Sequence, residues 1–353
     1  MTDDDFPPRM TRLTFHGPLS ESRAARIVAR LARTRPATVL DLGCGWGELM
    51  LRVLEAVPGA VGTGIDVSGA DLDRGRHSAA ARGLAGWASF IEESAVGTTR
   101  GPADLVLCVG STHVLSRDRP PQHTVSALHA LRRLVSPGGR VLLGEGFWEH
   151  PPSTGEIAAM WPGTTAGEYD DLAGLTGLAV SAGFRPEWIE TASLEEWDDF
   201  ESGVAADIEE WLASHPGHRL AAETRKKADD RLSIWLRGSR GCLGQAYLTL
   251  IPMPQQQAGL PVPSRPQARG KSNDSMSYKE SPDGARYRVG LALRREVAEL
   301  GEGHGPGPGD RLRQPGEGDG LPAGAASLAA HDQGGRGYLA VVGEPAVEAA
   351  DLG

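Results

Sequence analysis

Apolar positions alternate between two spacings over the first 250 residues of the chain. In 20–32, Ala24, Ile27, Val28 and Leu31 share one helical face behind a Ser20 cap. The same helical spacing recurs in 48–57, 69–83, 123–135 and 171–183. Short apolar runs of strand length stand between these segments, at 37–43, 60–67, 88–94, 104–110, 140–148, 184–192 and 245–252.

This alternation predicts an α/β fold. Strands that alternate with helices build a doubly wound, mostly parallel sheet, here of seven strands. Ligands of such sheets bind at the carboxyl ends of the strands, so we expect the chemistry of this protein at that edge.

Two segments depart from the alternation, near 149–170 and 193–238, and we expect both to be helical cap insertions. In the second, Ser193 and Glu196 have the spacing of a capping box. An apolar stripe follows it, formed by Trp197, Phe200, Val204, Ile208 and Trp211. The stripe fits either packing into the core or a helical cover over a substrate mouth.

The composition changes sharply near residue 251. From there to residue 353 the chain has no Trp, Phe or Cys, and glycine and proline make up more than a quarter of the residues. Such a segment buries too little apolar area to offset the entropy of ordering it. We therefore expect an arm at 1–19, one domain at 20–253 and a disordered tail at 254–353, with at most a short helix at 291–300. Three interpretations of the tail stay open: a dispensable segment, an interaction arm, or an extension translated out of frame from GC-rich DNA.

Charge and cysteine content exclude several classes of protein. The net charge of −10 argues against a general nucleic-acid binder, which needs a basic face. The three cysteines have no metal-ligand spacing, so neither a disulfide framework nor a zinc site is expected. The acidic start lacks the order of a secretory signal, and no apolar run approaches 18 residues. These features predict a soluble cytoplasmic protein without membrane contact.

The strand at 37–43 runs into a glycine-rich turn, "VLDLGCGWGE". Gly43, Gly45 and Gly47 give G-x-G-x-G, and Glu48 occupies the place of the third glycine of a dinucleotide fingerprint. A carboxylate there suits the positive end of the helix dipole but disfavours a pyrophosphate, and it tolerates a cationic or zwitterionic ligand better. Asp66, which ends the next strand, is placed to accept hydrogen bonds from ribose hydroxyls.

Together with "GIDVS", "ADLVLCVGSTHVL", "LRRLVSPGGRVLLGEGFW" and "SAGF", this turn resembles the class I S-adenosylmethionine-dependent methyltransferases. The resemblance spans about 20–252 and is greatest to small bacterial single-domain members. It implies a Rossmann-like methyltransferase fold and S-adenosyl-L-methionine as cofactor. The implied cofactor-binding residues are Asp41, Gly43, Cys44, Gly45, Gly47, Asp66, Val67, Glu93, Ser94, Ala95 and Cys108.

The resemblance also implies a role for each part of this set. Asp41 and the first two glycines shape the loop at the methionine moiety, and Gly47 lets the next helix pack on its strand. Glu93 and Ser94 take the place of the family's adenine-binding acid-small pair. Ser94 stands where the family has Asp, so this contact is either weaker or supplied by Glu93. Cys44 and Cys108 suit small buried positions better than nucleophiles, since no basic neighbour activates them.

Methyl transfer needs positioning and, for some acceptors, a base near the ends of the fourth and fifth strands. His113 follows the fourth strand and suits a base, since an unperturbed imidazole has a pKa of about 6.5; a structural or gating role is the alternative. Glu145, at the end of the fifth strand, is the second catalytic candidate. No metal is expected.

Aromatic and histidine side chains near the predicted site have two interpretations each. Phe147, Trp148 and Trp161 either wall an acceptor pocket or pack in the core. The arm at 1–19 is placed to bring His16 over the cofactor. Trp46 either contacts the cofactor or plugs the sheet edge.

We therefore expect methyl transfer from S-adenosylmethionine to an oxygen or nitrogen of a small molecule. One alternative is an NAD-dependent oxidoreductase, which the missing third glycine disfavours. The other is a catalytically inactive S-adenosylmethionine-binding protein. Nucleic-acid methylation is disfavoured because "STHV" stands where amino-methylating enzymes have [DNS]-P-P-[YFW].

Overall fold

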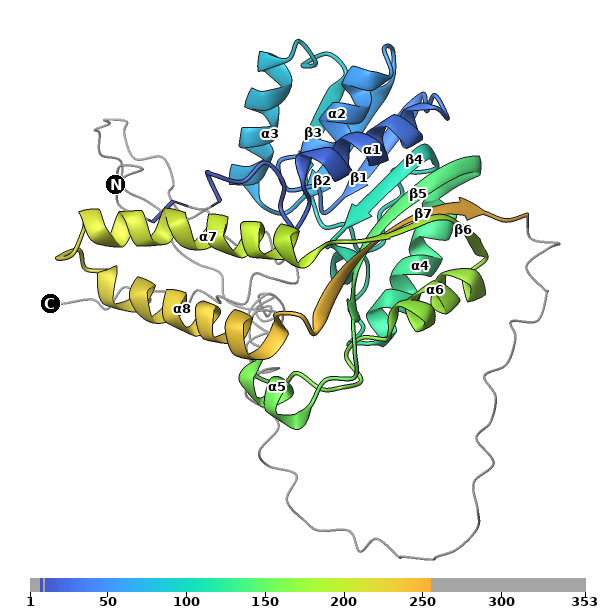
Figure 1. Cartoon of the computed structure of the whole chain (residues 1–353). Coiled ribbons are helices and arrows are strands. Elements are labelled where there is room, and N and C mark those ends of the chain that lie inside the picture. Colours follow the sequence, from blue (N-terminus) through green and yellow to red (C-terminus); the bar gives the residue numbers. More distant parts are fainter. Residues whose placement is uncertain (1–6, 9, 255–353) are drawn as a thin grey trace, which may run out of the picture. The chain divides into compact units, whose positions relative to one another are not determined.

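One mixed sheet of seven strands forms the centre of the fold, in the order β3-β2-β1-β4-β5-β7-β6 (Figure 1). The computed structural model describes residues 7–8 and 10–254, so the expected tail beyond 254, with the helix at 291–300, lies outside the described residues. The strands are β1 (Thr38–Leu42), β2 (Val61–Asp66), β3 (Ala88–Glu92), β4 (Ala103–Val109), β5 (Val135–Trp148), β6 (Phe184–Thr191) and β7 (Leu243–Pro252). All seven lie within or overlap the predicted runs.

The predicted doubly wound, mostly parallel sheet is confirmed, with one reversed strand. Strands β1 to β5 pair in parallel with one another, whereas β7 runs antiparallel to both of its neighbours, β5 and β6. The spacing of apolar residues does not encode strand direction, which is why the reversal was not predicted.

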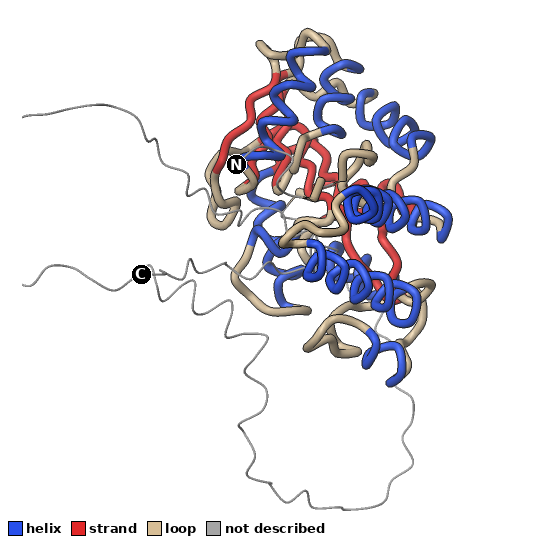
Figure 2. The backbone as a smooth tube through the Cα atoms, turned by 90° about the vertical axis from the view of Figure 1, so that its left-hand side faces the viewer, coloured by secondary structure: helices blue, strands red, loops and turns tan. Residues whose placement is uncertain are grey.

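Helices cover both faces of the sheet, as the view turned by 90° shows (Figure 2). They are α1 (Glu21–Ala32), α2 (Glu48–Ala56), α3 (Gly69–Ala81), α4 (Gln122–Leu134), α5 (Thr154–Ala159), α6 (Leu172–Ser181), α7 (Leu194–Ser214) and α8 (Ala221–Ile234). Helices α1, α2 and α3 pack into the core on one face, and α4 and α6 into the core on the other. None of the helices in 7–8 and 10–254 is long and apolar enough to cross a membrane.

Alternating side chains of the central strands divide these two cores. In β4, Leu105 and Leu107 join the core under α1 and α2, whereas Val106 and Cys108 join the core under α4. A strand points successive side chains to opposite faces, so an unbroken apolar run fits a strand buried on both faces.

Both expected cap segments contain helices, but 149–170 is helical only in α5, whereas α7 and α8 make up most of 193–238. Helix α5 and helix α7 each begin with a capping box, and α7 and α8 lie side by side as an antiparallel pair (Figure 1). Trp197, Phe200 and Val204 on α7 are buried in the same core as α1 and α2, and Trp211 packs with Leu212 in a small cluster. The apolar stripe of α7 therefore packs into the core.

Candidate active site

A cavity of about 260 Å³ opens at the carboxyl ends of β3, β2, β1 and β4. This is the edge at which the alternation of elements predicts ligand binding. Its lining residues come from the ends of these four strands and from the N-terminal arm: His16, Gly43, Ile65, Asp66, Val67, Glu93, Ser94, Ala95, Val96, Val109, Gly110, Ser111, His113 and Val114.

The turn after β1 forms part of the cavity wall, and it has no room for a side chain at Gly43 or Gly47. Gly43 adopts a φ of +64°, and a Cβ there would lie 2.6 Å from the Cβ of Ser111. Gly47 begins α2 with a φ of +67°, and a Cβ there would lie 2.6 Å from Cε1 of Phe90 on β3. Glycine alone meets both demands, a left-handed backbone and close approach of the neighbouring chain.

Asp66 presents its carboxylate to this cavity from the end of β2. Its side chain is 9 % exposed, and its two oxygens accept the backbone N–H groups of Gly45 at 2.8 Å and Ser68 at 3.0 Å. A carboxylate offers about four acceptor positions, so acceptor capacity remains for a ligand hydroxyl. The two backbone bonds fix the carboxylate, which pre-organises it for that contact.

Five predicted cofactor residues do not line the cavity: Asp41, Cys44, Gly45, Gly47 and Cys108. Asp41 is buried, and this burial, with the nearby charge of Asp66, raises its pKa to about 7. The thiol of Cys44 lies against Gly64 of β2, and Cys108 places its Sγ 3.4 Å from Oγ of Ser111. Burial raises the pKa of both thiols, that of Cys108 to about 12, so neither is suited to act as a nucleophile.

The residues after β3 line the cavity with mostly apolar surface. The Glu93 carboxylate is held by two bonds from Arg100, at 2.5 and 2.6 Å, and this partner lowers its pKa. Ser94 accepts the backbone N–H of Val96 through its hydroxyl at 3.3 Å. Any adenine contact from Glu93 must therefore be shared with Arg100.

The two catalytic candidates differ in their access to the cavity. His113 lines it from a 3₁₀ turn, η2 (Thr112–Leu115), that follows β4. Glu145 is 1 % exposed and does not line it; its carboxylate accepts the Thr112 hydroxyl and the Gly146 N–H. Burial raises the pKa of Glu145 to about 7. Its position suits a structural role, because its hydrogen bond with Thr112 stabilises the turn that carries His113.

The N-terminal arm crosses the glycine turn and brings His16 into the cavity wall. Nε1 of Trp46 donates to the carbonyl of Thr14 at 2.8 Å, and the His16 ring stacks on the Trp46 ring at 4.8 Å. The Arg74 guanidinium lies 3.7 Å from the centre of the same Trp46 ring and donates to the carbonyl of Leu13. Trp46 is therefore the anchor of the arm, and the arm places His16 as its position in the sequence predicts.

The other aromatic candidates are packed away from the cavity. Phe147 is buried in the core under α4 and α6. The indole N–H groups of Trp148 and Trp161 donate to the Ala166 carbonyl at 2.9 Å and to Glu168 at 3.3 Å. Core packing, the second interpretation of these three side chains, is what the structure shows.

Sequence reasoning missed several lining residues and gave one wrong reason. Ser111 was not singled out, although it directly follows the predicted strand at 104–110; its hydroxyl donates to the Leu42 carbonyl at 2.6 Å. Glu48 was expected to repel a pyrophosphate, but it does not line the cavity and pairs with Arg52 and Arg82. The lining therefore brings no negative charge from Glu48 to a ligand, and no lysine or arginine stands among the described lining residues.

Comparisons with known proteins agree on one class. Residues 39–139 match the family model described as a methyltransferase domain. The chain is 30% identical over 238 residues to the uncharacterized protein YjhP of Escherichia coli, which covers 67% of this chain and 93% of YjhP.

Solved structures give the same result. The chain resembles an S-adenosylmethionine-dependent methyltransferase of Geobacter sulfurreducens in complex with S-adenosylhomocysteine, with a TM-score of 0.60, 26% identity, and coverage of 69% of this chain and 98% of that one. The corresponding complex from Thiobacillus denitrificans matches with a TM-score of 0.60, 27% identity, and coverage of 69% and 98%.

Proposed function

This chain belongs to the class I S-adenosylmethionine-dependent methyltransferase family and takes S-adenosylmethionine as its cofactor, and we propose that it methylates an oxygen or nitrogen atom of a small molecule. The cavity fits this cofactor. Asp66 offers a fixed acceptor for ribose hydroxyls. The described wall holds neither lysine nor arginine, the side chains that pair most strongly with phosphate groups.

Bound S-adenosylmethionine supplies a methyl carbon activated by a sulfonium. The residues of this chain have to orient the acceptor, exclude water and remove a proton from the attacking atom. His113, which faces the cavity, would take up that proton. The bond from Thr112 to the buried Glu145 fixes the turn, so the imidazole keeps its direction.

The N-terminal arm supports a small acceptor. Besides its anchor at Trp46, the arm is tied to α7, because Thr11 donates its N–H and its hydroxyl to Asp207 at 2.6 and 2.8 Å. The arm is therefore held at two points beside the glycine turn, which narrows the room there for a large acceptor. The net charge of −10 also disfavours nucleic acids.

The observation that carries the proposal is the pair of histidines, His16 and His113, on the wall of one cavity beside Asp66. The test incubates the full-length chain with methyl-labelled S-adenosylmethionine and three panels: phenols, carboxylates and amines of low mass; proteins; and nucleic acids. Label in the low-mass panel is the expected result. Label confined to proteins or nucleic acids would overturn the small-molecule acceptor.

A further inference from the structure

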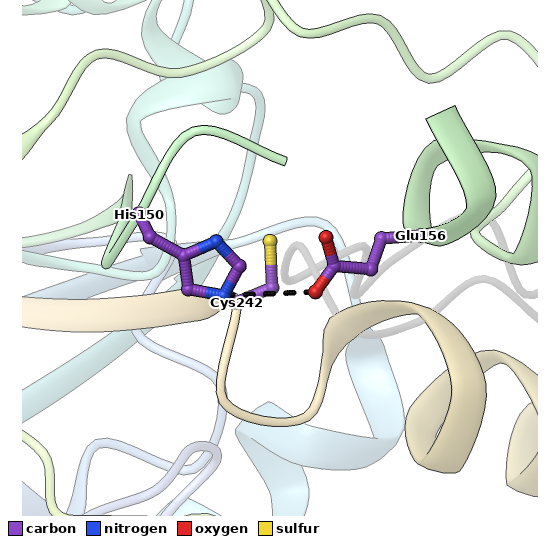
Figure 3. A group of neighbouring side chains, drawn as sticks. All are labelled: His150, Glu156 and Cys242. Atoms are coloured by element: carbon purple, nitrogen blue, oxygen red, sulfur yellow. Dashed lines mark ion pairs between the residues drawn. The ribbon is translucent and has the colours of Figure 1, made fainter. Parts of the chain in front are cut away.

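Three metal-binding side chains gather outside the cavity, at the end of the β5–β7 pair (Figure 3). One ligand atom each of His150, Glu156 and Cys242 lies within 4.8 Å of the other two. They come from three segments: the connection after β5, the first turn of α5, and the turn before β7. The proposed methyl transfer uses none of them.

The backbone fixes two of these residues opposite each other. The antiparallel ladder of β5 and β7 ends at the pair Trp148 and Leu243. One residue farther, the N–H of Glu149 donates to the carbonyl of Cys242 at 2.9 Å. His150 and Cys242 therefore lie at the end of a rigid ladder, so their approach follows from strand pairing.

Hydrogen bonds also direct the ligand atoms. Oε2 of Glu156 accepts both the N–H and the hydroxyl of Ser153 at 2.7 Å, which leaves Oε1 pointing to Nε2 of His150 at 3.6 Å. Nδ1 of His150 lies 3.2 Å from the carbonyl of Pro151. When Nδ1 donates there, Nε2 carries its lone pair toward the cluster; metal-bound histidines commonly donate their other ring N–H to a carbonyl in this way.

We propose that His150 Nε2, a carboxylate oxygen of Glu156 and Cys242 Sγ bind one zinc ion, with the fourth tetrahedral position open to water or a ligand. A nitrogen, an oxygen and a sulfur donor together suit zinc, whereas magnesium and calcium prefer oxygen alone. Binding replaces the thiol proton of Cys242 with the metal and releases that proton to solvent.

The geometry needs only a small adjustment. Ligand atoms about 2.0–2.3 Å from a tetrahedral zinc lie roughly 3.3–3.8 Å from one another. The present separations are at most 4.8 Å, so none has to close by more than about 1.5 Å, through movement of the His150 and Glu156 side chains. The side chain of His150 is 49 % exposed, so it has room for that movement, whereas buried Cys242 stays in place.

The test titrates the full-length, reduced, metal-free chain with zinc against a chromophoric chelator, and with cobalt to observe the thiolate charge-transfer band. We expect one strong site per chain and the band. Cys242→Ser should abolish the band, and Cys242→Ser, His150→Ala and Glu156→Gln should each weaken zinc binding at least about tenfold. Glutamine also forms a capping box, so Glu156→Gln preserves the start of α5.

His129→Ala is the matched control, because this exposed histidine on α4 is outside the cluster. Its zinc affinity should equal that of the unchanged chain. Thermal unfolding identifies any variant that fails to fold, in which case Glu156→Gln decides. Absence of a strong site, or a site that all three cluster variants leave unchanged, would overturn the proposal. Neither outcome depends on methyl transfer.

Discussion

Asp41 on β1 and Glu145 on β5 are both buried carboxyl groups, and burial raises the pKa of each to about 7. In the unfolded chain such groups titrate near pH 4. The folded protein therefore binds more protons than the unfolded chain between about pH 4 and 7, and protonation there favours the folded state.

The stability of the domain should accordingly fall as the pH rises through this window. Each group contributes at most about 1.4 kcal/mol per pH unit to the slope. Glu145→Gln removes one contribution, so the free energy of unfolding should decline less steeply between pH 5 and 7 than in the unchanged chain. Urea unfolding at pH 5, 6, 7 and 8 measures this. Equal slopes for both proteins would show that Glu145 is ionised when folded.

His113 carries the proposed proton transfer. His113→Gln should lower kcat by about 10²–10⁴-fold and leave cofactor affinity within about twofold of the unchanged chain. Single-turnover and steady-state rates with a low-mass acceptor found in the label screen measure this. His129→Gln, an exposed histidine on α4, is the control. An unchanged kcat in His113→Gln would remove His113 from the mechanism.

At this scale the sequence located Asp66, His113 and Gly43 at the cavity, because each stands at or just beyond a strand end. It also placed Cys44, Cys108 and Glu145 in the site, but their side chains point into the protein. Strand alternation gives the face of a residue within a strand, whereas the direction at a strand end depends on the turn that follows.

Among the elements, the N-terminal arm depends most on contacts that are distant in sequence. Its fixation depends on Arg74 of α3, which donates to the carbonyls of Met10 and Leu13 at 3.0 and 2.7 Å and covers the Trp46 ring. Arg74 therefore attaches the arm through two hydrogen bonds from a charged donor and one cation–π contact.

Arg74→Met should loosen the arm and weaken binding of S-adenosylhomocysteine by about three- to tenfold, because His16 leaves the cavity wall. The melting temperature should change little, since the arm contributes few core residues. Calorimetric titration measures the affinity. Arg133→Met, on the exposed side of α4, should bind like the unchanged chain. An unchanged affinity in Arg74→Met would show that the arm is not part of the site.

Apolar spacing predicted the strands and the core helices but not α8 as a separate helix. Only Ala221 of α8 is buried, and the helix contacts α7 partly through the ion pair of Arg231 with Glu201. Helix α8 therefore lacks the apolar stripe by which an amphipathic helix is recognised in a sequence.

In the described part of the molecule, β7 and α7 form hydrogen bonds with residues near the start of the chain. The hydroxyl of Tyr247 on β7 donates to the carbonyl of Pro18 at 3.0 Å, and Glu196 of α7 accepts bonds from Ser20 and Arg23. These contacts join residues more than 170 positions apart. A single sequence offers no signal for such pairs, so the predicted fold was right in its sheet and incomplete in how its cap is attached.

The cluster of His150, Glu156 and Cys242 illustrates the same limit. Cysteine spacing predicted no zinc site, because that rule looks for ligands that are close in sequence. Here the pairing of β5 with β7 brings together residues that are up to 92 positions apart. Only the sheet topology reveals them.

Methyl transfer by this chain requires that the cavity beside Asp66 binds S-adenosylmethionine. Calorimetry of the full-length chain with S-adenosylmethionine, S-adenosylhomocysteine and NAD tests it most directly, alongside Asp66→Ala and the matched control Asp73→Ala on the exposed side of α3. We predict saturable binding of the first two ligands, at least about tenfold weaker in Asp66→Ala and unchanged in Asp73→Ala, with none of NAD. Binding of NAD alone, or equal affinities in Asp66→Ala and the unchanged chain, would contradict the account.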